Sequence, residues 1–346
     1  MKRKAFQIGS SEVLSGQRVC IDLPVANLSN HTPITLPVHV LHGTRDGPTM
    51  FVSAAIHGDE VLGVEIIRRL LASKALKSLR GTLLCVPIVN AFGFISQQRY
   101  LPDRRDLNRS FPGTSNGSLA GQLAHLFLNE VVLRSDLGID LHTGAINRSN
   151  LPQLRGDFSK PELRQYARTF GAPIALHSRL REGSLRGAAE AAGVPVLLYE
   201  AGEALRLDEV AIRVGLKGIL NLMQSCAMIS ERRSGRPKAA PMFSRSSKWI
   251  RAPMAGLFSA HRALGAVVSE GETIGQVMNP YDGTMEAVTA RFDGVIIGRT
   301  NISVVNQADA LFHIATVRDH ETVEERVELI TNQLSGDPIF DDDEIV

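Results

Sequence analysis

Met50-Phe-Val-Ser-Ala-Ala-Ile-His57-Gly-Asp-Glu60 joins a continuous apolar run to two side chains that can bind a metal ion. The run 49–56 is typical of a strand buried in a parallel sheet, and the Gly-Asp pair after it favours a tight turn. From Glu60 to Ala75 the apolar residues recur at helical spacing. The stretch therefore predicts a strand, a turn and a helix, with His57 and Glu60 at the junction.

Strand and helix patterns alternate through the first two thirds of the chain. Expected strands cover 35–41 (an outer strand), 49–56, 82–89, 136–141, 174–177 and 194–199, and expected helices cover 60–75, 118–134, 160–170, 185–192 and 208–230. This alternation predicts an α/β fold, a three-layer αβα domain whose mixed, mostly parallel sheet has helices on both faces. Such sheets bind ligands at the carboxyl ends of their strands, where His57, His142 and Glu200 are expected.

A second histidine, in Asp140-Leu-His142-Thr-Gly144, completes a candidate metal site. Two neutral imidazoles and one carboxylate form the three-ligand set of a hydrolytic zinc site, which keeps a fourth position for water. His57, Glu60 and His142 are therefore the candidate ligands of one Zn²⁺ per chain, and the set favours a metallohydrolase. The alternative is structural: Asp59 and Glu60 would only stabilise the first turn of the following helix, where the helix dipole favours acids.

A loop marked by proline and glycine, between Arg99 and Gly113, carries four arginines within eleven positions. Guanidinium groups are the usual partners of substrate carboxylates, so this loop is a candidate substrate-binding segment. Asn108 and Arg109 are adjacent, and an asparagine beside an arginine can hold both oxygens of one carboxylate. The alternative interpretation is a solvated basic loop without a ligand.

Composition excludes several other classes of protein. A net charge of +2 with 21% charged residues gives no basic surface for a nucleic acid. No apolar run is long enough to span a bilayer and the N-terminus lacks a signal-peptide pattern, so we expect no membrane partner and a cytoplasmic location. The scattered cysteines Cys20, Cys85 and Cys226 fit a reducing compartment. The hydrophobic content of 44% allows a symmetric homo-oligomer.

The composition changes after the polar, proline-bearing stretch 231–241. Short apolar runs separated by glycines then predict a small all-β domain, similar to the barrel-sandwich hybrid of biotinyl and lipoyl carriers. The chain has no lysine between Lys248 and Val317, which excludes the swinging arm of those carriers. We expect a catalytic domain at 1–231, a linker at 232–245, the β domain at 246–318 and an acidic tail at 319–346.

Four ordered motifs together resemble the succinylglutamate desuccinylase/aspartoacylase family of the zinc carboxypeptidase-like superfamily. They are His-Gly-Asp-Glu at 57–60, Asp-Leu-Asn-Arg-Ser-Phe-Pro-Gly at 106–113, Asp-Leu-His-Thr at 140–143 and Tyr-Glu-Ala-Gly at 199–202. The resemblance covers residues 48–228. It implies a zinc-exopeptidase-like catalytic domain, and the region after the linker is similar to the β domain that these enzymes append.

The resemblance also implies a role for each motif residue. In chain order, His57 and Glu60 bind zinc, Arg99 polarises the scissile carbonyl, Asn108 and Arg109 hold a substrate carboxylate, His142 completes the zinc site, and Glu200 is the general base that activates the zinc-bound water. The spacer after Arg99 is longer than in aspartoacylases and contains Arg104 and Arg105. Independently of the resemblance, Arg155 follows the His142 strand on a loop and is expected to contact the acyl or side-chain end of the substrate.

We therefore expect a zinc-dependent hydrolase that cleaves the amide bond of an N-acyl amino acid or a related small amide. Such a deacylase acts on carbon-nitrogen bonds other than peptide bonds, and its partner is a small molecule. Two alternatives remain: a metallocarboxypeptidase acting on peptides, and a non-catalytic metal-binding relative. A peptidase needs an open cleft, whereas a deacylase has its access narrowed by loops or by the second domain.

Overall fold

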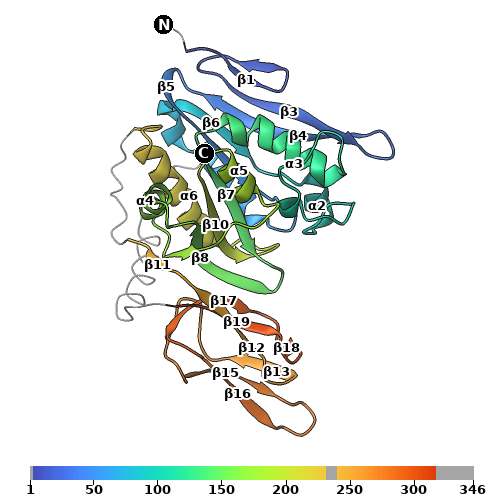
Figure 1. The fold of residues 1–346 in the computed structure, drawn as a ribbon, viewed down its shortest axis with the longest axis vertical. Helices are drawn as coiled ribbons and strands as arrows, with labels where there is room; N and C mark the ends of the chain where they lie inside the picture. The colour runs from blue at the N-terminus through green and yellow to red at the C-terminus, as the bar shows by residue number, and fades with distance from the viewer. Residues whose placement is uncertain (1–2, 231–239, 317–346) are drawn as a thin grey trace.

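The computed structural model describes residues 3–230 and 240–316 (Figure 1). Residues 231–239, most of them in the predicted linker, and 317–346, which include the predicted acidic tail, lie outside the described residues. The division of the chain into domains stays a prediction. Among the described helices, none has the length and apolar character needed to cross a membrane.

Residues 3–230 contain six α-helices and ten of the strands. The helices are α1 (Leu62–Ala72), α2 (Ala91–Ser96), α3 (Leu119–Glu130), α4 (Pro161–Phe170), α5 (Leu185–Ala191) and α6 (Glu209–Ser225), with short 3-10 segments at Lys74–Ser78, Leu107–Arg109 and Val132–Arg134. The strands are β1 (Phe6–Ile8), β2 (Ser11–Val13), β3 (Arg18–Asn27), β4 (Pro33–His42), β5 (Arg45–Ala54), β6 (Arg80–Val86), β7 (Leu137–Gly144), β8 (Arg148–Gly156), β9 (Ile174–His177) and β10 (Val196–Glu203).

A parallel core lies in the middle of a large mixed sheet. β6, β5, β7 and β10 pair in this order with parallel registers. β4 and β3 extend the sheet antiparallel beyond β6, and β8 pairs antiparallel with β10 on the other side. The predicted mixed sheet is confirmed.

Helices cover both faces of this sheet. α1, α4 and α6 pack on one face and α3 and α5 on the other, each group with its own apolar core. Successive residues of β5 alternate between the two cores: Met50 and Val52 belong to the first and Phe51 to the second. Side chains of a strand point alternately to opposite faces, so one buried strand supplies both cores. The predicted three-layer αβα arrangement is confirmed.

Two segments differ from the sequence-based expectation. Arg155 does not lie on a loop but on β8, where it pairs with Leu198 of β10. The polar residues of β8 obscure the strand pattern because several of them face a cavity rather than a core. The sequence predicts an outer strand at 35–41. The corresponding strand, β4, lies inside the sheet instead, because β6 pairs with one of its edges and β3 with the other.

The C-terminal strands continue the main sheet and add a second one. They are β11 (Met242–Ser244), β12 (Ser247–Arg251), β13 (Gly256–Ala260), β14 (Val267–Val268), β15 (Thr273–Met278), β16 (Met285–Thr289), β17 (Gly294–Thr300), β18 (Val304–Val305) and β19 (Ala310–Thr316). β17 pairs with β8, and β19 and β12 follow, while β16, β15, β13 and β18 form a separate sheet. Residues of both sheets share one apolar core. The predicted all-β region is confirmed, and it gathers at one end of the long axis (Figure 1).

Where β12 and β19 pair, Trp249 and His313 lie side by side. Their rings stack with 4.7 Å between centroids and 8° between planes, and Nε2 of His313 lies 2.8 Å from the Ser247 hydroxyl. Burial, reinforced by the positive charge of Arg155, lowers the pKa of His313 to about 3. His313 therefore stays neutral in the folded protein at mildly acidic pH.

This pKa predicts a loss of stability at mildly acidic pH. Below pH 6.5, the ordinary histidine pKa, the unfolded chain binds a proton at residue 313 that the folded chain does not bind until about pH 3, so the free energy of unfolding falls as pH falls. His313→Phe keeps a ring but removes the titrating group. From pH 7 to pH 5 the wild type should lose about 1 to 2 kcal/mol more than this variant in urea unfolding. Equal losses in both proteins would contradict the prediction.

Candidate metal centre and its cavity

The turn that carries His57 and Glu60 is held by tight backbone contacts. It leaves β5 through Ala55, which has a positive φ of 51°. Gly58 lies so close to Gly93 of α2 that an added Cβ would be 1.9 Å from the Gly93 carbonyl carbon, so only glycine fits there. The Glu60 amide closes the turn by donating to the His57 carbonyl oxygen at 3.1 Å.

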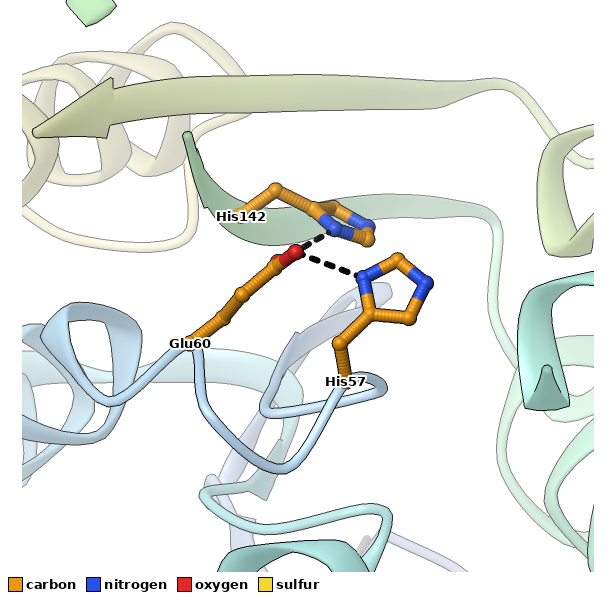
Figure 2. Close-up of side chains that lie close together, drawn as sticks. All are labelled: His57, Glu60 and His142. Carbon is orange, nitrogen blue, oxygen red and sulfur yellow. Dashed lines mark hydrogen bonds and ion pairs between the residues drawn. The ribbon is translucent and has the colours of Figure 1, made fainter. Parts of the chain in front are cut away.

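Figure 2 shows the Glu60 carboxylate between two imidazoles that come from different parts of the chain. Nδ1 of His57 lies 2.6 Å from one Glu60 oxygen, and Nδ1 of His142, on β7, lies 2.7 Å from the other. The backbone amide of Thr143 also donates to this second oxygen, at 3.2 Å. All three side chains are buried.

Each imidazole has a second carboxylate at its other nitrogen. Nε2 of His142 lies 2.7 Å from Asp140, and Nε2 of His57 lies 3.2 Å from Asp106. Carboxylates in this position fix the tautomer and orientation of metal-binding histidines. One potential ligand atom from each of His57, Glu60 and His142 lies within 4.8 Å of the others, so the donor set fits a divalent metal ion.

His57, Glu60 and His142 form a cluster in which burial and neighbouring charges shift each pKa in opposite directions. Desolvation disfavours the charged form of Glu60, but the two imidazoles outweigh it and hold the pKa of Glu60 well below its ordinary value. Desolvation also lowers the pKa of both histidines, but the carboxylates outweigh it: Glu60 and Asp106 raise the pKa of His57, and Asp140 and Glu60 raise that of His142. The cluster is therefore a site where buried charges stabilise one another.

Glu200 lies on β10, in register with His142 on the neighbouring β7. Nδ2 of Asn150 donates to one Glu200 oxygen at 2.6 Å, and Nε of Arg155 lies 2.9 Å from the other. The second contact is an ion pair without the alignment of a hydrogen bond. β8 therefore supplies both groups that hold this carboxylate.

Asp106 connects the arginine loop to the cluster. One of its oxygens accepts a hydrogen bond from the Asn108 amide at 2.8 Å and lies near Nε2 of His57, and the other accepts from Arg99 at 2.9 Å. The Arg99 guanidinium also lies 3.5 Å from Glu60. The loop is therefore tied to the candidate metal ligands rather than freely solvated.

Asn108 and Arg109 lie in the 3-10 segment that follows Asp106. Oδ1 of Asn108 accepts a hydrogen bond from the Leu185 amide at 2.9 Å, at the start of α5, and the Arg109 guanidinium donates to the Asn108 carbonyl. Both residues line a cavity, whereas Arg104 and Arg105 of the same loop do not.

The cavity has a volume of about 720 Å³ and brings together all of the sequence-predicted site residues. They are His57, Glu60, Arg99, Asn108, Arg109, His142, Arg155 and Glu200. The volume suits a ligand of amino-acid size with an acyl group. The wall also includes Arg245, the last residue of the predicted linker, together with Ser247 and Trp249, which follow that linker.

Several residues of the site had no signal strong enough for prediction from sequence. Asp106 begins the Asp-Leu-Asn-Arg motif, which is a signal for its contact with His57. Asn150 has no such signal, because the polar residues of β8 conceal the strand. Arg186 and His313 reach the cavity only through tertiary structure. Local sequence patterns do not report such long-range contacts.

Comparison with known proteins places this site in a family. The sequence model of the succinylglutamate desuccinylase/aspartoacylase catalytic domain matches residues 46–226, just over half of the chain. The chain is also 27% identical over 313 residues to the N-alpha-acetyl-L-2,4-diaminobutyric acid deacetylase of Halomonas elongata, with 86% of this chain and 90% of that protein covered.

Solved structures agree with this match. A succinylglutamate desuccinylase/aspartoacylase from Rhodobacter sphaeroides has a TM-score of 0.76 at 25% identity, with 87% of this chain and 96% of that chain covered. The product-bound ectoine utilization protein EutE of Ruegeria pomeroyi shares the fold, with a TM-score of 0.77 at 22% identity over 87% of this chain and 95% of that chain. The chain belongs to the succinylglutamate desuccinylase/aspartoacylase family.

Proposed function

We propose that this protein is a zinc-dependent deacylase that hydrolyses the amide bond of an N-acyl amino acid. The observation that carries the proposal is one cavity that holds a three-residue metal cluster together with a separate carboxylate, Glu200. The name of the Halomonas relative describes a deacetylase of an acetylated amino acid, which supports this reaction class.

His57, Glu60 and His142 would hold the metal through two imidazole nitrogens and a carboxylate. A zinc ion bound there supplies Lewis acidity, which lowers the pKa of water and polarises a carbonyl group. Asp106 and Asp140 keep the imidazoles in the tautomer and orientation that ligation requires.

Glu200 serves as the general base in the first half of the reaction and as the general acid in the second. It takes a proton from the water whose oxygen adds to the acyl carbon, and it delivers this proton to the amine nitrogen as the carbon-nitrogen bond breaks. Asn150 and Arg155 fix the position of its carboxylate. The products are a carboxylate and a free amine.

The cationic and amide groups of the cavity position the substrate. Asn108 and Arg109 hold the carboxylate of the amino acid, and Arg155 contacts the other end of the substrate. Arg99, next to Glu60, stabilises the negative charge that develops on the carbonyl oxygen, an interaction that usually dominates acyl-transfer catalysis.

The cavity wall favours a small substrate over a peptide. Side chains of β12 and β19, Trp249 and His313, form part of the wall of the cavity that holds the metal cluster. A metallocarboxypeptidase would need room for a chain of residues on this side. A non-catalytic role is disfavoured because the cluster and the candidate base lie on one cavity.

Replacing the Glu200 carboxylate by an amide should greatly slow turnover but leave the zinc content unchanged. Glu200→Gln keeps the size of the side chain and an acceptor for Asn150, but it cannot transfer the proton, so kcat should fall by about 10²- to 10⁴-fold. Hydrolysis is measured on N-acetyl, N-succinyl and N-formyl amino acids and on dipeptides, together with the zinc content.

The matched control is Glu203→Gln, three residues further along β10 at a position that does not line the cavity. Its turnover should stay within about twofold of the wild type. Cleavage of dipeptides alone would favour the peptidase. Wild-type protein that neither contains nor takes up zinc would favour the non-catalytic alternative.

Asp140 should control metal affinity through His142. Asp140→Asn weakens the acceptor at Nε2 of His142, so the zinc affinity should fall about 10- to 100-fold. Competition with a chelator of known affinity measures this change. Asp136→Asn, at the start of β7 and away from the cluster, is the control and should bind zinc as the wild type does. Unchanged affinity in Asp140→Asn would show that the contact does not support the metal.

A further inference from the structure

The pairing of β8 with β10 is irregular beside Glu200. Glu200 pairs with Gln153 of β8, whereas Gly202, two residues further along β10, pairs with Asn150, three residues away from Gln153. β8 therefore has one residue more than β10 in this stretch. Such a β-bulge bends a strand and redirects its side chains, and bulges are frequent beside active sites.

A second irregularity lies on β17, the other neighbour of this part of β8. In the pairing of β17 with β19 the register skips Ile297. The next residue, Gly298, pairs with Asn150 of β8 on one side and with His313 of β19 on the other. The irregularity at Ile297 thus determines which residue of β17 lies against Asn150.

The side chain of Gln153 joins the two irregular segments. It is completely buried, and its Nε2 donates to the carbonyl oxygens of Leu151 on β8 and Ile297 on β17, both at 3.2 Å. Both acceptors belong to residues that the strand registers skip. Oε1 of Gln153 has no partner among the described residues, and the reversed amide would set this oxygen against two carbonyl oxygens. One amide therefore fixes β17 relative to β8.

Gly298 leaves little room beside the Asn150 amide. A Cβ added at position 298 would lie 2.8 Å from Oδ1 of Asn150 and 3.1 Å from Cβ of His313. Gly298 is not among the residues with a positive φ, so the close approach and not the backbone conformation requires glycine here. Any larger residue would have to displace the Asn150 amide.

The same amide orients the candidate base. Nδ2 of Asn150 donates to Glu200 at 2.6 Å, while Oδ1 lies against Gly298. Because the amide group is planar, a push on Oδ1 also moves Nδ2. The other contact of Glu200, with Arg155, lacks the alignment of a hydrogen bond. The hydrogen bond from Asn150 is therefore the directional contact of this carboxylate.

We propose that Gly298 and Gln153 are positioning residues for Glu200 and that both act through the amide of Asn150. Gln153 holds β17 against β8, and Gly298 leaves the space from which the amide reaches the carboxylate. Neither residue lines the cavity. The role of Glu200 as a base rests on the proposed function, whereas the contact between Asn150 and Glu200 does not.

Gly298→Ala tests the steric part of the proposal. The added methyl group should push the Asn150 amide away from Glu200, so kcat should fall about 10- to 100-fold, because small displacements of catalytic groups are costly. KM should stay within about twofold of the wild type, since Gly298 does not line the cavity. The substrate is the acyl amino acid that the wild type hydrolyses fastest, and zinc content and melting temperature are measured alongside.

A double-mutant cycle shows whether this loss passes through Asn150. Asn150→Ala alone should lower kcat about 10- to 100-fold, and it removes the oxygen that the new methyl group would meet. Gly298→Ala should then cause no further loss when it is added to Asn150→Ala. Losses that multiply in the double variant would overturn the proposal.

Gln153→Met tests the hydrogen-bonding part. It keeps the length of the side chain but removes both donated hydrogen bonds, so kcat should fall about tenfold, and only in a chain that retains Asn150. Gly298→Ala decides the question even where this buried variant does not fold.

Gly275→Ala is the matched control for crowding in the C-terminal region. Its added Cβ would lie 2.8 Å from the Ser259 carbonyl oxygen, in the second sheet and outside the cavity. The variant should lower the melting temperature but keep the kcat of the wild type. A loss of kcat as large as that in Gly298→Ala would contradict a specific role of Gly298.

A measurement without turnover separates this inference from the proposed function. The side-chain amide of Asn150 gives two proton–nitrogen NMR signals, which are assigned by their absence in Asn150→Ala. In zinc-loaded protein they should shift in Gly298→Ala and stay in place in Gly275→Ala. Signals that do not move in Gly298→Ala would overturn the inference whether or not the wild type is active. Shifted signals together with a wild type that hydrolyses no acyl amino acid would keep the contact and contradict the deacylase.

Discussion

The parallel pairing of β5, β7 and β10 determines where the candidate metal ligands and the candidate base lie. Adjacent strands run about 4.8 Å apart, so their carboxyl ends meet at one edge of the sheet. His142 and Glu200 are in register on β7 and β10, and the turn after β5 brings Glu60 against His142. A shift of one residue in this pairing would turn each side chain to the other face. The contact of Gly58 with α2 prevents the turn itself from moving.

The same arrangement brings three carboxylates close together, and a bound cation would stabilise their negative charge. Three carboxylates alternate with two imidazoles in the order Asp106, His57, Glu60, His142 and Asp140, and most of these side chains are buried. Buried carboxylates are unfavourable unless they are paired. Neutral imidazoles, the form that ligates a metal, would leave three negative charges close together. A divalent cation among them lowers this cost, which is the physical reason to read the cluster as a metal site.

The sequence predicts the parts of the fold and site that depend on local pattern. Apolar runs identify the buried parallel strands. His57, His142 and Glu200 are then predicted as site residues because they are polar and lie at the carboxyl ends of those strands. β8 is not predicted from the sequence because Asn150 and Arg155 line a cavity. Their polar side chains interrupt the alternation of apolar and polar residues that identifies a strand. Trp249 and His313 are brought together by the pairing of β12 with β19 across most of the C-terminal region, and no local pattern reports that contact.

Continuity of the sheet gives the C-terminal strands a part in the site as well as in the fold. β17 pairs with β8, and β8 also carries Asn150 and Arg155, the two residues that hold Glu200. Any displacement of β17 would therefore reach the candidate base through backbone hydrogen bonds. It would also move the stacked His313 and Trp249, which line the same cavity. The candidate base and the stacked pair are thus linked by one continuous set of strand pairings, from β10 through β8 and β17 to β19 and β12.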